Sequence, residues 1–133
     1  MDIGSYSPPR FETMPLTGSA TLEGTARYRD RFKDQAAENH FRNEQNLWLS
    51  SIGLGTYLGV EDDTTDAKYT AAGVRAVELG ANVIDTAANY RFQRSERSIG
   101  KALGELTSKN GFSVVAPIIV IAPSSTAGNR VSC

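Results

Sequence analysis

The stretch VIDTAANY, residues 83–90, says most about the fold of this chain. It opens with a short apolar segment typical of a buried strand, and Asp85 stands where that segment ends. In parallel α/β folds, ligands bind and chemistry occurs at the carboxyl ends of the strands. Tyr90 follows in the predicted loop. Spacing alone favours a structural interpretation, in which Asp85 caps the next helix and Tyr90 packs on its flank.

The segments around this stretch alternate between strand and helix patterns. Residues 62–65 offer helix caps, apolar side chains then recur at helical spacing, and Gly80 is a suitable stop. A second helix is predicted from about Ser95 to Lys109. Upstream, residues 47–56 form an apolar segment with glycines, which suits a buried strand running into a tight loop. This βαβα order predicts an α/β fold with a parallel sheet and helical crossovers.

The remaining segments divide the chain into three parts, residues 1–46, 47–109 and 110–133. Residues 1–20 are rich in Ser, Pro, Gly and Thr, which favours a flexible lead. Residues 21–28 contain Gly24 between β-prone pieces and predict a small hairpin. Residues 30–45 are dense in charge, and we interpret them as a surface helix or an irregular lead-in.

The third part differs in composition, since residues 110–129 contain no Asp, Glu, Lys, Arg or His. Residues 114–122 predict a third strand, although Pro117 removes a ladder donor from its middle. We hypothesise that a frameshift or mis-splicing replaced the native sequence after about Phe112. Reading the coding DNA in the other two frames tests this idea: if neither frame resumes βα units, it is wrong.

Composition excludes several classes of function. A net charge of −1 provides no field to gather nucleic acid or an anionic membrane. The first ten residues lack the apolar core of a signal peptide, and the apolar run at 114–122 is far shorter than the ~20 residues of a membrane-spanning helix. The only cysteine, Cys133, cannot form a disulfide within the chain. His40, the only histidine, has no obvious partners for a metal and is expected to be solvated. We therefore predict a cytoplasmic protein without a metal site.

Three segments together resemble the aldo-keto reductase family. The first is Asp85-Thr86-Ala87-x-x-Tyr90, preceded by a β segment and by a helix that ends in Glu78-Leu79-Gly80. The second is upstream at residues 52–57, IGLGTY, and is similar to the first barrel strand and its loop. The third, SERSIGKAL at residues 95–103, is similar to the helix after the active-site tyrosine. Agreement of all three in order and spacing favours a catalytic interpretation of Asp85 and Tyr90.

The resemblance implies a (β/α)₈ TIM barrel, of which this chain holds the first two or three βα units, and NADPH-dependent reduction of a small aldehyde or ketone. In that family a tyrosine, matched by Tyr90, gives a proton to the carbonyl oxygen while the nicotinamide delivers hydride. A lysine lowers the pKa of the phenol, and an aspartate, matched by Asp85, lies against the lysine. Gly55, Thr56 and Tyr57 match the loop that lines the nicotinamide end of the cofactor, and Asp85 lies beside it.

The sequence departs from the family pattern in two of the four catalytic groups. The lysine belongs at the end of the third strand, yet that segment continues Ile121-Ala122-Pro123-Ser124. Lys101 and Lys109 fall in the second helix, and the family's histidine has no counterpart because His40 precedes the first strand. A barrel typically needs about 250 residues. We therefore expect a truncated reductase sequence that is inactive alone.

Two other interpretations follow from the same features. The chain could be a non-enzymatic interaction module whose βα units dock on a full-length relative or another partner. An open sheet edge and apolar faces would also favour self-association or aggregation. A reductase assembled from several copies is disfavoured, because no copy supplies the lysine or the histidine.

Overall fold

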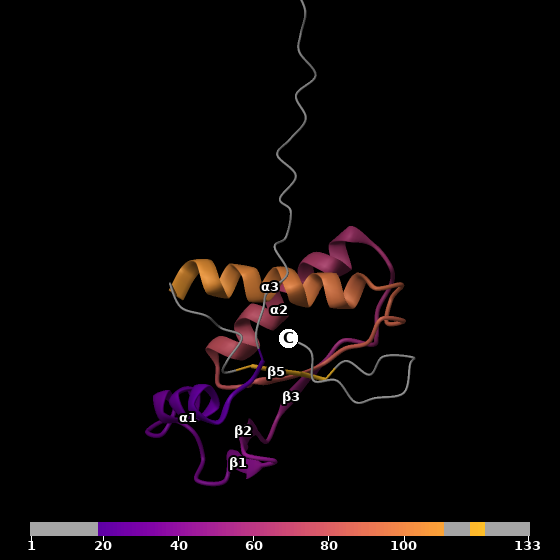
Figure 1. The fold of residues 1–133 in the computed structure, drawn as a ribbon. Coiled ribbons are helices and arrows are strands. Elements are labelled where there is room, and N and C mark those ends of the chain that lie inside the picture. Colours follow the sequence, from indigo (N-terminus) through magenta and orange to yellow (C-terminus); the bar gives the residue numbers. More distant parts are fainter. Residues whose placement is uncertain (1–18, 111–117, 122–133) are drawn as a thin grey trace, which may run out of the picture.

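The computed structural model describes residues 19–110 and 118–121. Two sheets and three helices make up this part of the chain (Figure 1). In chain order the elements are α1 (Leu22–Arg31), β1 (Phe41–Glu44), β2 (Leu47–Ser50), β3 (Gly53–Gly55), α2 (Asp63–Glu78), β4 (Val83–Asp85), α3 (Arg94–Asn110) and β5 (Ile119–Ile121).

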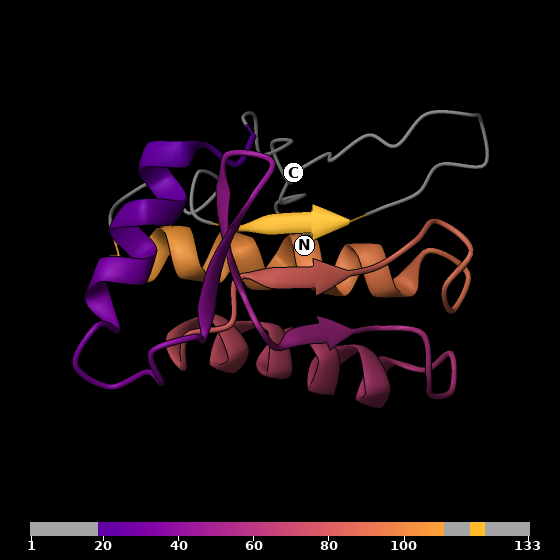
Figure 2. The same cartoon turned by 90° about the horizontal axis from the view of Figure 1, so that it is seen from below.

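The central sheet is parallel, with the strands in the order β3-β4-β5. Figure 2 shows the three arrows pointing the same way, with α2 and α3 both on one face of the sheet. The α/β prediction with helical crossovers is thus confirmed. The third predicted strand is present as β5, whereas residues 114–117 and Ala122 of that prediction lie outside the described residues. Closure into a barrel stays a prediction.

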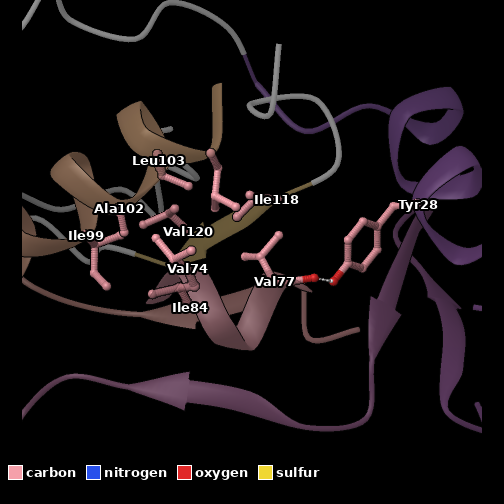
Figure 3. Close-up of a cluster of buried hydrophobic side chains, with 10 residues drawn as sticks. Tyr28, Val74, Val77, Ile84, Ile99, Ala102, Leu103, Ile118 and Val120 are labelled. Atoms are coloured by element: carbon pink, nitrogen blue, oxygen red, sulfur yellow. Dashed lines mark hydrogen bonds between the residues drawn. The ribbon is translucent and has the colours of Figure 1, made fainter. Parts of the chain in front are cut away.

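The core lies between this sheet and its two helices. Side chains alternate along β4, so Ile84 faces the helices and is buried while Asp85 is exposed. The buried cluster, most of which is drawn in Figure 3, consists of Tyr28, Val74, Val77, Ile84, Ile99, Ala102, Leu103, Leu106, Ile118 and Val120. This cluster fixes the sheet against the helices and so fixes where the strands end.

The predicted ends of α2 agree with the structure. Asp62 is the N-cap, and its carboxylate accepts a hydrogen bond of 2.8 Å from the Thr65 N–H. Gly80, just beyond the helix, has φ of +102°, a conformation that glycine adopts without strain. The strand predicted at residues 83 and 84 follows as β4, and α3 begins one residue before the predicted Ser95.

The small hairpin predicted at residues 21–28 is wrong, because this segment forms helix α1. Thr21 caps the helix by accepting a 2.9 Å hydrogen bond from the Gly24 N–H. Tyr28 on this helix is 2% exposed, and its hydroxyl donates to the Val77 carbonyl at 2.5 Å (Figure 3). Helix formation buries this ring against Phe32 and Phe41, which outweighs the low helix propensity of Gly24.

A hairpin does form, further along the chain. Residues 30–45 were expected to be a surface helix or an irregular lead-in. Residues 32–40 are irregular, as the second alternative states, whereas residues 41–44 form β1, which pairs antiparallel with β2. Gln45 and Asn46 both have positive φ, as a two-residue turn of this kind requires. The boundary predicted between residues 46 and 47 falls where this turn ends and β2 begins, so it separates the two strands of one hairpin. Residues 47–56 therefore split into β2 and β3, which belong to different sheets.

Figure 2 shows α1 and the β1–β2 hairpin at the end of the sheet where the parallel strands begin. His40, expected to be solvated, is instead half-buried there. Its Nδ1 lies 2.9 Å from the Ser51 hydroxyl, and its Nε2 lies 2.9 Å from the Gly80 carbonyl oxygen. The prediction failed because both partners come from segments that the fold brings to His40.

Within residues 19–110 and 118–121, none of the helices combines the length and the apolar character needed to cross a membrane.

Candidate active site

The candidate site lies at the opposite edge of the sheet, where the parallel strands end. The strand register places Asp85 level with Gly55 on one side and Ile121 on the other. Asp85 is exposed, and among the described residues its carboxylate has no hydrogen bond or ion pair. It does not cap α3, which begins at Arg94, so the purely structural interpretation of Asp85 is not observed.

Thr56 ties the ends of two strands to the start of α3. Its side chain is fully buried, and its hydroxyl donates to the carbonyl of Asp85 at 2.9 Å. The Ser95 hydroxyl in turn donates to the carbonyl of Thr56 at 2.6 Å. Thr56 therefore positions the backbone of Asp85, while its own side chain points away from solvent.

Gly55 leaves open space beside Asp85. A Cβ atom built on Gly55 would meet no heavy atom of the described residues within 4 Å, and Gly55 is exposed. Because the two residues are level across β3 and β4, a flat ligand group could approach the backbone at this point.

The structure brings two of the predicted site residues into contact. The rings of Tyr57 and Tyr90 meet edge to face, with their centroids 5.0 Å apart and their planes at 74°. Tyr57 is 66% exposed, and Tyr90 is half-buried. The loops that follow β3 and β4 thus present a phenol pair beyond the carboxyl ends of these two strands.

Arg91 is a residue of this region that the sequence did not reveal. Its side chain is 1% exposed, and its guanidinium donates to the Val60 carbonyl through Nε at 3.0 Å and through one terminal nitrogen at 2.8 Å. The same terminal nitrogen lies 2.6 Å from a carboxylate oxygen of Asp66. No local signal distinguishes it from a surface arginine, because its partners are 25 and 31 residues away in sequence.

Asp66 joins Arg91 to Arg94. Its second oxygen lies 2.6 Å from an Arg94 nitrogen, and Arg94 also contacts Asp63 at 3.2 Å. Partial desolvation tends to raise the pKa of Asp66, but the hydrogen bonds from the two guanidinium groups prevail and hold that pKa below its ordinary value. The first turn of α2 is thereby bound to the start of α3.

The expected lysine is absent at the level of Asp85. The residue that the register places beside Asp85 on β5 is Ile121, and residues 122–124, Ala-Pro-Ser, lie outside the described residues. The lysines of the chain are Lys33, Lys68, Lys101 and Lys109, and all four are exposed on helices or in the turn after α1.

His40 lies at the other end of the sheet, against Gly80. Within the described residues, no group of three His, Cys, Asp or Glu side chains is suited to hold a metal ion.

Comparison with known proteins agrees with this arrangement of strands and loops. A sequence model of the aldo/keto reductase family matches residues 51–120, more than half of the chain. The match begins before β3 and ends within β5, and it continues past Phe112, where the hypothesis of replaced sequence placed the end of family sequence. Neither the curated proteins nor the solved structures contain a match to the chain. The matched span carries Asp85, Tyr90 and the loop from Gly55 to Tyr57, and the chain belongs to the aldo/keto reductase family.

Proposed function

We propose that this chain carries the aspartate and the tyrosine of a site for NADPH-dependent reduction of a small aldehyde or ketone, built on the first βα units of a (β/α)₈ barrel. One observation supports the proposal most strongly. Asp85 lies at the carboxyl edge of β4, level with Gly55, while Tyr90 in the next loop contacts Tyr57. In TIM barrels this edge of the strands is where active sites form.

Each of these residues has a defined task in the proposed reaction. NADPH, when bound, supplies hydride to the carbonyl carbon. The Tyr90 hydroxyl donates its proton to the carbonyl oxygen, and contact with the Tyr57 ring orients the phenol. The open backbone at Gly55 leaves room for the nicotinamide end of the cofactor. Thr56 holds the Asp85 backbone at the edge of the sheet.

The 133-residue chain is proposed to be inactive as a reductase on its own. A phenol has an ordinary pKa of ~10 and becomes an effective acid–base catalyst near pH 7 when a cation lies beside it. The family supplies that cation as a lysine held by the aspartate. Here the position level with Asp85 on β5 is Ile121, and the sequence contains no lysine after Lys109.

A titration of the chain with NADPH, followed by nicotinamide fluorescence, tests the proposed cofactor contact. We expect weak but saturable binding, which Gly55→Val removes because its side chain fills the space beside Asp85. Gly104→Ala is the control, since a Cβ there also meets no atom of the described residues within 4 Å but lies on α3. Absence of saturable binding, or binding that Gly55→Val leaves unchanged, would contradict the proposal.

An assay of NADPH consumption tests whether the chain is inactive as a reductase, and it bears on the alternative of a non-enzymatic interaction module. With NADPH and an aromatic aldehyde, we expect no consumption of NADPH above buffer. Turnover that Tyr90→Phe abolishes would show that the chain is active and that the inactivity proposal is wrong. A chain that unfolds cooperatively, yet has no affinity for NADPH, would favour the non-enzymatic interaction module.

A further inference from the structure

We propose that Arg91 is the positioning residue for Tyr90, fixing the tyrosine by fastening the β4–α3 loop to the β3–α2 loop. The inference deepens the proposed function and rests on it, since it assumes that Tyr90 is the proton donor. Among the described residues, no hydrogen bond or ion pair joins Arg91 to Asp85, so its effect is transmitted through the loop that carries Tyr90.

The acceptors of Arg91 all belong to the preceding βα unit. Its guanidinium holds the Val60 carbonyl with two donors and also lies 3.5 Å from the Asp62 carbonyl. A planar guanidinium with several fixed donors suits such a cluster of acceptors better than a single ammonium does. The loop that contains Tyr57 is therefore bound directly to the residue that follows Tyr90.

Tyr69 strengthens the same junction from α2. The Arg91 guanidinium carbon lies 5.0 Å from the centroid of the Tyr69 ring, within the range of a cation–π contact. The Tyr69 hydroxyl donates a hydrogen bond to the Leu58 carbonyl. Arg91 and Tyr69 thus hold two successive parts of the loop after Tyr57.

The backbone around Arg91 shows why such an anchor is needed. Arg91, Phe92 and Gln93 have φ angles of 49°, 52° and 65°, and none of them is glycine. Non-glycine residues adopt the left-handed region at a cost in free energy, so a run of three persists only where surrounding contacts impose it. Phe92 is 75% exposed, and Gln93 is also exposed. Arg91 is the buried member of the run, so its side-chain contacts are the ones that impose this conformation.

Arg94 provides a natural comparison because it shares Asp66 with Arg91. It is 29% exposed, and its other partner Asp63 is fully exposed. Arg94 makes no hydrogen bond to the loop from Tyr57 to Val60 within the described residues. Loss of Arg94 removes an ion pair with Asp66, whereas loss of Arg91 also removes the link between the two loops.

The test uses the full chain, without cofactor, labelled with ¹³C at the ε carbons of its five tyrosines, because these carbons carry ring protons. Tyr57→Phe and Tyr90→Phe assign the two signals, and an NOE between the rings reports their contact. We expect Arg91→Ala to abolish this NOE and to shift the Tyr90 signal toward that of free tyrosine. Arg94→Ala should leave both unchanged. The Tyr28 signal reports whether the core is intact, because that ring is buried on α1, and α1 lies at the other end of the sheet (Figure 2).

Retention of the NOE in Arg91→Ala, with Tyr28 at its native shift, would overturn the proposal. If Arg91→Ala does not fold, Arg91→Met decides by the same criterion, since it keeps much of the buried volume and removes the donors. The readout needs no cofactor, so a failure of the unchanged chain to bind NADPH would count against the proposed function alone. A retained NOE in a folded Arg91 variant would count against the role of Arg91 alone.

Discussion

Asn82 and Ser50 are joined by two hydrogen bonds that run in opposite directions. The Ser50 N–H donates to the Asn82 side-chain oxygen at 2.8 Å, and the Asn82 N–H donates to the Ser50 hydroxyl at 3.0 Å. The side-chain nitrogen of Asn82, Nδ2, also donates to the Trp48 carbonyl at 2.8 Å. Asn82 is fully buried directly before β4, so one side chain connects the β1–β2 hairpin to the parallel sheet.

Asn82→Ala should lower the free energy of unfolding by about 2–3 kcal/mol, because it leaves a buried N–H of Ser50 and a carbonyl of Trp48 without their partner. Urea denaturation monitored by circular dichroism measures this change. The matched control is Asn43→Ala, an exposed position on β1, where we expect a change within about 0.5 kcal/mol. Equal effects at the two sites would contradict the role of Asn82.

Two glycine-to-alanine substitutions should have opposite signs. A Cβ on Gly73 of α2 would lie 3.0 Å from the Cβ of Ala102 and 3.3 Å from a methyl carbon of Ile99, so Gly73→Ala should destabilise the chain by about 1–3 kcal/mol. A Cβ on Gly100 of α3 would meet no atom of the described residues within 4 Å, and Gly100→Ala should stabilise by about 0.5–1 kcal/mol. Thermal melts of the two variants provide the comparison, and a stabilising Gly73→Ala would rule out close packing of the two helices.

The stability of the chain should fall at alkaline pH through Tyr28. Burial raises the pKa of its hydroxyl above the ~10 of an unfolded tyrosine. A group whose pKa is raised on folding contributes stability below its unfolded pKa and loses it as pH rises toward the folded pKa. Tyr28→Phe removes the hydrogen bond to Val77 and should lower the free energy of unfolding by about 1 kcal/mol at pH 7. The difference between the two chains should shrink between about pH 10 and pH 12, because only the unchanged chain loses stability above the unfolded tyrosine pKa. Urea midpoints across this range test the expectation, and parallel pH profiles would refute it.

The stability of the chain should also fall at acid pH, through Asp66. Its pKa is lowered on folding, so its stabilising effect is present above the ordinary carboxyl pKa of ~4 and is lost as pH falls through the lowered value. Asp66→Asn should be less stable than the unchanged chain at pH 7, and the two should converge as pH falls below about 4. A difference that stays constant down to pH 2.5 (roughly 1.5 units under the ordinary carboxyl pKa) would show that the ion pairs with Arg91 and Arg94 are not its source.

The sequence predicted α2 and β4 well because their signals are local. Asp62 and Gly80 mark the ends of the helix by capping chemistry, and the apolar pair Val83 and Ile84 defines the strand. The same kind of signal misled at α1, where Gly24 and its β-prone neighbours suggested a hairpin. The contact that stabilises the helix joins Tyr28 to a carbonyl 49 residues away and leaves no local trace.

Some residues of the candidate site could be predicted from the sequence, and others could not. Asp85 and Tyr90 could be selected because a strand end and a family motif coincide there, and only the family resemblance pointed to Gly55 and Tyr57. The structure pairs Asp85 with Gly55 across the strands and the Tyr90 ring with that of Tyr57. Arg91 could not be found, because burial of an arginine depends on acceptors supplied by another βα unit. His40 was misjudged for the same reason.

The bond from the Ser50 amide to Asn82 has a consequence for hydrogen exchange. The N–H groups within an antiparallel ladder are released when the two strands separate, but the Ser50 N–H is held by a side chain outside the hairpin. It exchanges with solvent when the hairpin leaves the parallel sheet, even while β1 and β2 remain paired. The protection factor of this single amide therefore measures the free energy of local detachment, separately from that of global unfolding.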